Sequence, residues 1–554
     1  MHDSEHNNLR QQFQTHRIEN QPTALFDQNL WQSDLALQQA THHYAGDWAD
    51  QQLNQMGAVT GIQQMTLGEL ANTHKPILHR FDRYGRRIDE VEFHPAYHQL
   101  MHNAAEHAVH NFSWQNQHQS GAHVIRSALM YINSQADAGT ACPLTMTHAA
   151  VPCLAHSPEL SAIWLPKILA NGYDPRALPI AEKQSCTIGM GMTEKQGGSD
   201  VRRNSSRAYL QANGDYQIVG HKFFFSAPMC DAHLVLAQLD AGLSCFLMPR
   251  ILPDGSLNAV HVQRLKNKLG DWSNASSEVE FQGATAYLIG EAGRGIATIL
   301  EMVALTRLDC VIGSAAQMRQ ALVQVLDHVK QRAAFGKLLI DQPIMRNVLT
   351  DLSIESEAAL LLGFRVAQAI DAAPHDATQA AFARIATAIA KFWVCKRTPA
   401  FINEAQECLG GIGYVEENIL PRLYRQAPLN SIWEGSGNIQ CLDVLRSLHK
   451  DRSTAAALFA ELKLAQGRHP AYDQHLICLE QQFQMQDNFE KKARLLVERT
   501  ALALQAAQLL LHGDPAMATM FCATRFGTDY GFSFGSFSDD QYNAHILTRA
   551  MPNL

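Results

Sequence analysis

The chain has 554 residues, of which 46% are hydrophobic and 18% charged, and its formal net charge is −8. At roughly 150 residues per domain, this length predicts about three or four domains. Mean hydropathy is −0.18 and no apolar run is long enough for a transmembrane helix, so we expect no membrane partner. The acidic balance also argues against a protein held on nucleic acid by its overall charge.

The cysteines and the first residues of the chain indicate the compartment. Eleven cysteines are scattered from Cys142 to Cys522 without a CxxC pair. This usage predicts reduced, mostly buried thiols rather than a disulfide framework or a zinc ribbon. The start lacks the basic-then-apolar plan of a signal peptide. We therefore expect a cytoplasmic protein with no metal site.

Composition and periodicity divide the chain into five segments. We expect a polar arm at 1–30, an N-terminal α-helical domain at 31–184, a β domain at 185–292, a helical bundle at 293–450 and a C-terminal helical extension at 451–554. The arm, rich in Gln, His and Asn, can order against a neighbouring subunit. Ser157-Pro158-Glu159 marks a helix start. The segment 352–370 is apolar on almost every side, so it belongs inside a bundle or between subunits.

Short alternating runs that flank turn residues predict the β domain. They pair 207–210 with 216–226 around Asn213-Gly214-Asp215, and 233–238 with 243–248 around Asp240-Ala241-Gly242, with one further run at 277–281. A second pattern lies in the helical region before it, where acidic and imidazole side chains recur every four residues: His94, His98, His102, Glu106 and His110. Neighbours at this spacing can share a metal. Because a four-residue step drifts about 40° per helical turn, a solvated or packed stripe is the favoured interpretation.

Three separate segments could carry chemistry. The glycine-rich run 189–200 offers backbone N–H groups and hydroxyls that suit a phosphate or a flavin edge, with an ordinary tight turn as an equal alternative. In 220–226, three successive aromatics must point to alternate faces of a strand, so one face can wall a ring system, although plain core packing is the simpler interpretation. In 430–440, Glu434 follows an apolar Ile-Trp pair that would raise its pKa toward that of a general base. The alternative is an exposed glutamate at a helix start.

In order and spacing, these segments resemble the acyl-CoA dehydrogenase superfamily of FAD flavoproteins over about residues 130–450. The stretches 191–200, 420–425 and 430–439 are most similar to its AidB-type alkylation-response branch. Lys195 stands where the superfamily usually has proline, a change that this branch shares. The resemblance implies an α+β multidomain fold, with an N-terminal α domain, a small antiparallel β domain, a C-terminal helical bundle and an extra C-terminal helical region.

The resemblance also implies a reaction and a cofactor. Glu434 would remove the α-proton of an acyl-CoA thioester while the β-hydrogen leaves as hydride to FAD. It places Phe224 as the aromatic wall behind the flavin and Ser226 at the hydroxyl that bonds the ring. The residues carried over to the FAD site are Met190, Met192, Thr193, Gly198, Ser199, Phe224, Phe225, Ser226, Trp433, Gly435, Ser436 and Asn438.

Five further residues match contacts that the family makes to FAD across a subunit boundary: Arg332, Phe335, Gln342, Gly410 and Gly411. An arginine fork suits a diphosphate, and glycines let a ligand approach the backbone. The resemblance therefore implies a homotetramer, built as a dimer of dimers, with FAD near the subunit interfaces.

AidB-type proteins are also described as DNA-associated, so the alternative is a flavoprotein that protects double-stranded DNA from alkylation, with FAD largely structural. Its candidate DNA contacts are Arg446, Lys491, Lys492 and Arg494. From Leu445 onward, however, eleven basic residues stand against eleven acidic ones. Phosphate affinity needs cations gathered on one surface, so this alternative requires the fold to cluster them. Acyl chain length and the electron acceptor stay open.

Overall fold

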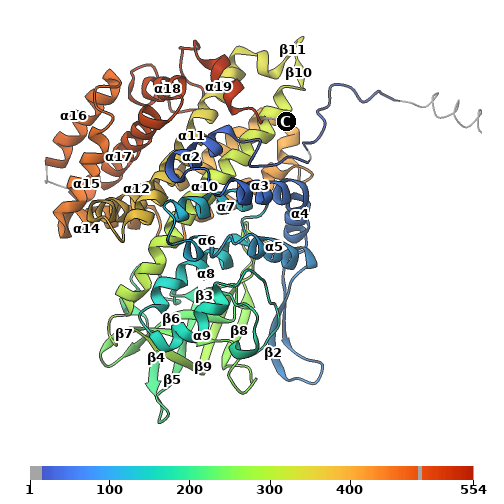
Figure 1. Cartoon of the computed structure of the whole chain (residues 1–554). Helices are drawn as coiled ribbons and strands as arrows, with labels where there is room; N and C mark the ends of the chain where they lie inside the picture. The colour runs from blue at the N-terminus through green and yellow to red at the C-terminus, as the bar shows by residue number, and fades with distance from the viewer. Residues whose placement is uncertain (1–14, 26, 485–488, 553–554) are drawn as a thin grey trace, which may run out of the picture.

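The computed structural model of the chain describes residues 15–25, 27–484 and 489–552. Helices of the bundle and the C-terminal region form the upper part of the molecule in Figure 1, and the β domain forms the lower part. The N-terminal helices lie between them. Among the described residues, none of the helices combines the length and apolar character needed to cross a membrane.

The N-terminal domain is mostly helical. Its helices are α2 (Leu35–Ala45), α3 (Asp50–Val59), η1 (Thr60–Gln64), α4 (Met65–Thr73), α5 (Pro95–Glu106), α6 (Phe112–Gln115), α7 (Ala122–Ala136), α8 (Ala141–Leu154) and α9 (Pro158–Ile168). Ser157 is the N-cap of α9 and Pro158 its first residue, which confirms the predicted helix start.

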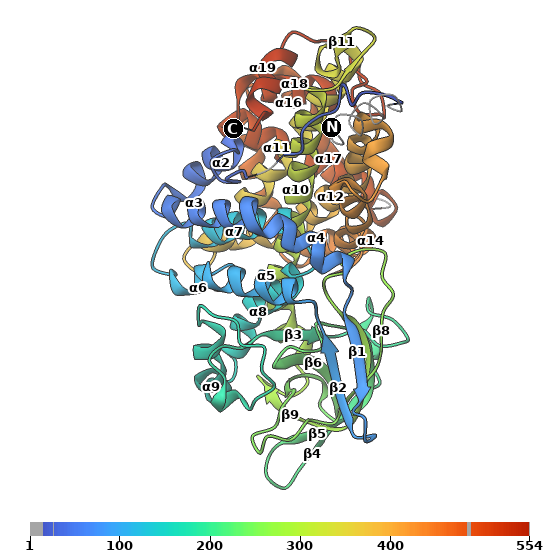
Figure 2. The same cartoon turned by 90° about the vertical axis from the view of Figure 1, so that its right-hand side faces the viewer.

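One part of this region is a β-hairpin, although the sequence predicts helices throughout. Residues 77–92 form an antiparallel hairpin, β1 (Ile77–Phe81) and β2 (Arg87–Glu92). Figure 2 shows the hairpin running beside β8 (Val260–Leu265), where Arg80 donates to Gln263. No residue of β1 is buried. The strand therefore lacks the alternation of apolar and polar residues by which a half-buried strand is predicted.

The strands of the β domain are β3 (Ile188–Gly191), β4 (Arg207–Leu210), β5 (Tyr216–Ser226), β6 (Ala232–Leu239), β7 (Gly242–Pro249), β8 and β9 (Ser276–Ile289). The predicted hairpins β4–β5 and β6–β7 are confirmed. Pairings β6–β7, β7–β9, β9–β5, β5–β4 and β4–β6 close a ring around a small core, with β3 and β8 added at its rim. All pairings are antiparallel except those of β3 and β4 with β6.

Strand β9 is longer than the predicted run 277–281. Gly283 has a φ of +85° and sits at a bulge opposite β5, so the strand continues past it. A glycine inside a strand commonly marks such a bulge.

The bundle consists of long helices that cross above the β domain. They are α10 (Gly295–Val329), α11 (Pro343–Ala372), α12 (Ala377–Leu409), α13 (Ile419–Gln426) and α14 (Gly437–Lys450). Helix α11 is buried on almost every side, as predicted, and packs against α10, α12 and α17 (Phe489–His512). It therefore fills the middle of the bundle.

The C-terminal helices are α15 (Arg452–Lys463), α16 (Pro470–Gln484), α17, α18 (Pro515–Phe526) and α19 (Asn543–Ala550). Buried ion pairs tie them to the bundle. Arg525 of α18 contacts Asp351 at 2.6 Å and Glu355 at 2.9 Å, both on α11, and the three side chains are at most 4% exposed. Helix α19 packs against α11 and α2, and α2 also packs against α11, so the first and last α-helices of the described chain meet on the same helix.

Replacing Arg525 by methionine should destabilise the protein strongly, because Asp351 loses its cation and Glu355 loses one of its two. Breaking a buried pair from one side typically costs about 3–5 kcal/mol. Urea unfolding followed by circular dichroism measures this change. Arg207→Met is the matched control, since Arg207 pairs with Asp240 on the surface and should matter little. Equal stability of both variants and the wild type would contradict the role of this cluster.

Candidate active site

Glu434 lies on a left-handed backbone turn between η6 (Leu429–Ser431) and α14. Its φ is +57°, and that of Gly435 is +93°. A non-glycine residue in this region is strained and persists only where surrounding contacts hold it. The turn therefore has to be fixed by its neighbours.

A buried lysine supplies the first of these contacts. Lys391 of α12 is 1% exposed, and its Nζ donates to the carbonyl of Trp433 at 2.7 Å and to that of Gly435 at 2.8 Å. One ammonium group thus bonds the carbonyls on both sides of Glu434. The lysine positions the turn without touching the carboxylate.

Two further side chains bond the carbonyl of Glu434 itself. Arg307 of α10 donates through Nε at 3.0 Å, and Gln440 of α14 donates through Nε2 at 3.0 Å. Arg307 is held in turn by Asp443, at 2.7 Å, which also pairs with Arg384 of α12 at 2.7 Å. Helices α10, α12 and α14 together hold the strained turn.

The Glu434 carboxylate is half-buried and accepts a hydrogen bond from Thr306 Oγ1 of α10 at 2.9 Å. Burial raises its pKa above the ordinary value, while the Thr306 bond and the charges of Lys391 and Arg307 partly lower it again. A carboxylate with a raised pKa and a fixed position suits proton abstraction.

The glycine-rich segment begins within β3 and is shaped by a second buried charge. Glu194 is fully buried and pairs with Lys222 Nζ of β5 at 2.8 Å, while Ser205 N–H donates to its other oxygen at 2.6 Å. Burial alone would raise the pKa of Glu194, but the Lys222 charge and these bonds lower it to about 2. A Cβ on Gly191 would lie 2.6 Å from the Phe225 ring, so the strand requires glycine there.

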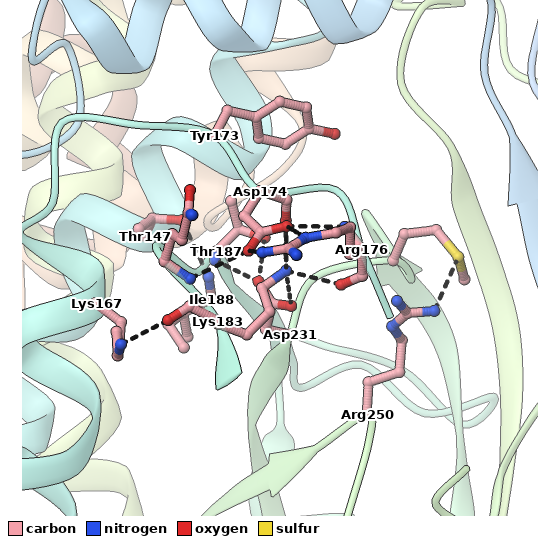
Figure 3. Close-up of polar contacts among 12 residues, drawn as sticks. Thr147, Lys167, Tyr173, Asp174, Arg176, Lys183, Thr187, Ile188, Asp231 and Arg250 are labelled. Carbon is pink, nitrogen blue, oxygen red and sulfur yellow. Dashed lines mark hydrogen bonds and ion pairs between the residues drawn. The ribbon is translucent and has the colours of Figure 1, made fainter. Parts of the chain in front are cut away.

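A polar network fixes the start of β3 (Figure 3). Ile188 N–H donates to Thr147 Oγ1 of α8 at 3.0 Å, and Thr187 N–H donates to Asp231 at 2.8 Å. Asp231 also pairs with Lys183 Nζ at 2.8 Å. Helix α8 and the end of the preceding loop thereby place β3 and the glycine-rich segment after it.

The residues of this segment that are predicted to bind FAD differ in their exposure to solvent. Met190 is buried, Met192 and Thr193 are half-buried, and Gly198 and Ser199 are exposed. A Cβ on Gly198 would lie 2.4 Å from Thr193 Oγ1, so the segment folds back on itself. Thr193 and Met192 stand at its inner side, where a ligand would meet both side chains and backbone.

The aromatic run of β5 divides between two faces. Phe224 is 51% exposed, whereas Phe225 is 1% exposed and stacks on His233 in the β-domain core, with ring centroids 3.9 Å apart. The Phe225 ring is therefore not open to a cofactor, and the Phe224 ring is the accessible one. Ser226 is half-buried beside Ser276, with their hydroxyl oxygens 3.2 Å apart.

Cations gather at the beginning of α14. Ser436 is the N-cap, and its exposed hydroxyl makes no capping bond to the described residues. Arg494 of α17 donates to Asn438 at 2.9 Å, and a Cβ on Gly437 would lie 3.5 Å from Lys396 Nζ. A helix N-terminus with two nearby cations is suited to a phosphate group. Arg494, a candidate DNA contact, thus lies beside a residue predicted to bind FAD.

The residues predicted to act across subunits lie on exposed segments. Arg332, Phe335 and Gln342 are on or beside the hairpin of β10 (Ala333–Ala334) and β11 (Lys337–Leu338), which stands at the end of the molecule opposite the β domain (Figure 1). Phe335 is 99% exposed. Gly410 and Gly411, in η5 (Gly410–Tyr414), are also exposed. The structure does not bring these segments to Glu434 of the same chain.

The N-terminal arm contacts this hairpin. Asn20 Nδ2 donates to the Ala333 carbonyl at 2.8 Å, Ala333 N–H donates to Asn20 Oδ1 at 2.7 Å, and Arg332 donates to the Asn20 carbonyl. Thr23 N–H donates to Gln331 at 2.9 Å. Residues 1–14 and 26 of the predicted arm lie outside the described residues.

The histidine stripe does not converge. His94 caps α5, His98 contacts Tyr173, His102 lies 3.8 Å from Glu106 on the surface, and His110 is buried against the Ile168 carbonyl. Within residues 15–25, 27–484 and 489–552, no group of three or more His, Cys, Asp or Glu side chains could hold a metal ion.

Sequence reasoning did not single out Thr306, Arg307, Lys391, Glu194 or Lys222, all of which shape the site. Only Glu194 and Lys222 lay inside recognised motifs, the segments 189–200 and 220–226. The others are ordinary residues of helices α10 and α12, and the roles of all five arise from contacts across 28 residues or more. Periodicity and local motifs do not reveal such pairs.

Known domain families match most of the chain. Residues 20–175 match the N-terminal domain of adaptive response protein AidB, 189–284 the acyl-CoA dehydrogenase middle domain, and 293–449 the acyl-CoA dehydrogenase C-terminal domain. AidB of Escherichia coli (strain K12), whose designation as an acyl-CoA dehydrogenase is provisional, is 46% identical over 540 residues, or 97% of this chain and 98% of that one.

Solved structures have the same fold. The crystal structure of Caenorhabditis elegans ACDH-11 in complex with C11-CoA has a TM-score of 0.85 at 24% identity, covering 97% of this chain and 98% of that one. A glutaryl-CoA dehydrogenase from Mycobacterium smegmatis in complex with FADH2 has a TM-score of 0.54 at 18% identity, covering 64% and 86%. The predicted fold class is confirmed: helical domain, small β domain, helical bundle and extra C-terminal helices.

Replacing Lys391 by methionine should destabilise the protein, because the Trp433 carbonyl loses its buried donor and the Gly435 carbonyl keeps only Gln440 Nε2, at 2.8 Å. An unsatisfied buried acceptor costs about 1–3 kcal/mol. Guanidinium unfolding measures the loss. Lys396→Met, on the same helix, removes a cation without removing these bonds and is the control. The prediction fails if both variants unfold at the same denaturant concentration.

Replacing Glu434 by glutamine should alter how stability depends on pH. A raised pKa in the folded state means that stability falls as pH rises from the unfolded pKa through the folded one, because the buried carboxyl must ionise. Glutamine removes this loss of stability. Compared with the difference at low pH, the free energy of unfolding of the variant should therefore rise relative to that of the wild type once the pH exceeds the folded pKa. The expected rise is about 1.4 kcal/mol for each pH unit that separates the folded pKa from the unfolded one. Unfolding curves at acidic and neutral pH measure the difference, and a gain that is constant with pH would contradict the raised pKa.

Proposed function

Because the chain belongs to the acyl-CoA dehydrogenase family, in its AidB branch, we propose that it is an FAD-dependent oxidoreductase that dehydrogenates an acyl-CoA thioester between its α- and β-carbons. The observation that carries this proposal is the Glu434 carboxylate. It is bonded by Thr306, has a raised pKa, and is fixed by donors from three helices. Such a group can accept the acidic α-proton of a thioester.

The residues predicted to bind the cofactor have properties that fit FAD. Phe224 offers an accessible ring face, and the half-buried Thr193 and Met192 stand at the inner side of the glycine-rich segment. The start of α14, with Arg494 and Lys396 nearby, suits a diphosphate. When bound, FAD supplies the acceptor for the hydride that leaves the β-carbon. Glu434 takes the proton, and Thr306 holds the carboxylate in place.

We assign the FAD contacts as the sequence predicts, with Phe225, whose ring lies in the core, offering only its backbone. Within one chain these are Met190, Met192, Thr193, Gly198, Ser199, Phe224, Phe225, Ser226, Trp433, Gly435, Ser436 and Asn438. Trp433 is anchored for this role, since its Nε1 donates to Asn430 at 2.9 Å.

The exposed hairpin and η5 support a proposed homotetramer. Phe335 is almost fully exposed and Ile344, just after the hairpin, is 82% exposed. Large apolar side chains at an unpaired tip favour contact with another surface. Arg332, Phe335, Gln342, Gly410 and Gly411 would then reach the FAD of a neighbouring subunit. An FAD-loaded monomer in solution would contradict this assembly.

The second candidate is a role in the response to DNA alkylation, with FAD largely structural. It is supported by Arg446 of α14 and by Lys491 and Lys492 of α17, which are exposed on two helices that pack together. Against it, Arg494 is bonded to Asn438, and Arg446 lies eight residues further along α14, about 12 Å at 1.5 Å per residue. The candidate cations are therefore spread out rather than gathered.

Anaerobic titration of the FAD-loaded protein with straight and branched acyl-CoAs should bleach the flavin absorbance. Glu434→Gln should bind the same ligands and lose the bleaching, because the amide cannot take the α-proton. Removing a general base typically costs about 10²–10⁴-fold in rate. Stopped-flow absorbance measures that loss.

Glu416→Gln is the control for this experiment, since Glu416 is a surface residue paired with Arg425 and should leave bleaching unchanged. Bleaching that survives in Glu434→Gln would contradict the assignment of the base. Absence of bleaching by every acyl-CoA, together with salt-sensitive duplex binding that Arg446→Ala abolishes, would favour the DNA role instead.

A further inference from the structure

A lysine ammonium group lies over the aromatic run of β5. Lys266 directly follows β8, and its Nζ lies 4.5 Å from the centroid of the Phe224 ring and 3.3 Å from that of Phe223. The two rings meet edge to face, with centroids 5.3 Å apart. A cation over an aromatic face is attracted by the negative potential of that face. Because Phe224 is the ring predicted to face the flavin, this cation stands beside the candidate cofactor site.

A β-bulge explains why two consecutive aromatic side chains reach the same cation. In the pairing of β5 with β9, Phe223 and Phe224 together oppose the single residue Glu278. Regular alternation would send these two rings to opposite faces of the sheet. A bulge interrupts the alternation and re-aims a side chain, and bulges are common next to active sites. Here the bulge leaves both rings in contact with Lys266.

The ammonium group is held in place by an ion pair. The Lys266 side chain is 12% exposed, and its Nζ donates to Glu278 Oε1 at 2.7 Å. Arg264 bonds the same oxygen, through Nη2 at 2.6 Å and Nε at 2.7 Å. The bonds from Arg264 and Lys266 hold the pKa of Glu278 below its ordinary value, so the carboxylate stays charged. Two cations against one carboxylate leave the group with a net positive charge.

Backbone hydrogen bonds connect this group to two predicted FAD contacts. Phe223 N–H donates to the carbonyl of Thr193 in the glycine-rich segment at 2.8 Å. Lys266 N–H donates to the carbonyl of Ser276 at 2.7 Å, and the Ser276 hydroxyl oxygen lies 3.2 Å from that of Ser226. Thr193 and Ser226 are both predicted to bind FAD. The position of the cation is therefore fixed relative to the candidate cofactor site.

We propose that Lys266 is a positioning residue of the cofactor site, which acts through the Phe224 ring to raise the reduction potential of bound FAD. The inference rests on the proposed function. Lys266 stands over one face of the ring, and the 51% exposure of Phe224 leaves surface for the flavin. Reduction by two electrons and one proton adds one negative charge to the flavin. A fixed cation nearby favours that charge, because Coulomb attraction falls only with the inverse of distance.

A redox titration of the FAD-loaded full chain, followed by flavin absorbance against a reference dye, tests this role. Lys266→Met removes the charge and keeps most of the side-chain length. At a fixed potential, the ratio of reduced to oxidised flavin should fall about fivefold or more. Lys266→Arg keeps the charge and should restore the wild-type ratio. The dissociation constant of oxidised FAD, measured by fluorescence on the apoprotein, should change by less than about threefold.

Two further variants separate an electrostatic role from a packing role. Glu278→Gln removes the carboxylate from between its two cations, so the ratio of reduced to oxidised flavin should rise. A loss of packing would weaken the binding of both flavin states and would not move the ratio in opposite directions in the two variants. Lys75→Met is the matched control. Lys75 Nζ lies 3.5 Å from the centroid of the Trp272 ring, which is not a predicted FAD contact, so the ratio should stay unchanged.

The outcomes separate this inference from the proposed function. A wild-type ratio in FAD-loaded Lys266→Met, or a lowered ratio in Glu278→Gln, overturns the inference, while bleaching of the wild type by acyl-CoA keeps the dehydrogenase function standing. If Lys266→Met does not fold, the direction of the shift in Glu278→Gln decides. A wild type that binds no FAD overturns both proposals together.

Discussion

A glutamate can occupy a left-handed turn only where its surroundings offset the backbone strain, and at Glu434 that offset comes from hydrogen bonds to three successive carbonyl groups. The donors are Lys391, Arg307 and Gln440, from α12, α10 and α14. They are far apart in sequence, so the turn can form only when these helices are already packed. The position of the carboxylate is therefore a property of the whole bundle.

The glycine-rich segment of the β domain is also held in shape by buried polar contacts. In the β domain, the Glu194–Lys222 pair shapes the glycine-rich segment from within. Helix α10 connects the β domain to Glu434, because it begins directly on β7. A Cβ on Gly295 would lie 2.4 Å from the Ser244 backbone, and eleven residues later the same helix presents Thr306 to Glu434. The β domain and the bundle thus share helix α10, which contacts β7 at one end and Glu434 further along.

The sequence predicted features that depend on neighbouring residues. Turn residues located the hairpins of β4–β5 and β6–β7, and the composition around Glu434 predicted a carboxylate with a raised pKa. The alternation of a strand already separates Phe224 from Phe225, although both were assigned to the cofactor. Features that depend on distant contacts were missed. The β1–β2 hairpin has too few buried residues to show a period, and Lys391 looks like any lysine in a helix until its carbonyl partners are known.

The contact between the arm and the hairpin has a consequence for chemical ageing. The side-chain amide of Asn20 imitates a strand, since it both donates to and accepts from the backbone of Ala333. Asn20 is exposed, and deamidation would turn its NH2 group into a second acceptor. The new carboxylate oxygen would then face the Ala333 carbonyl, with no hydrogen between them. One slow surface reaction would weaken the contact between the arm and the segment that carries Arg332 and Phe335, which would then depend on the bonds of Arg332 to the Asn20 carbonyl and of Thr23 to Gln331.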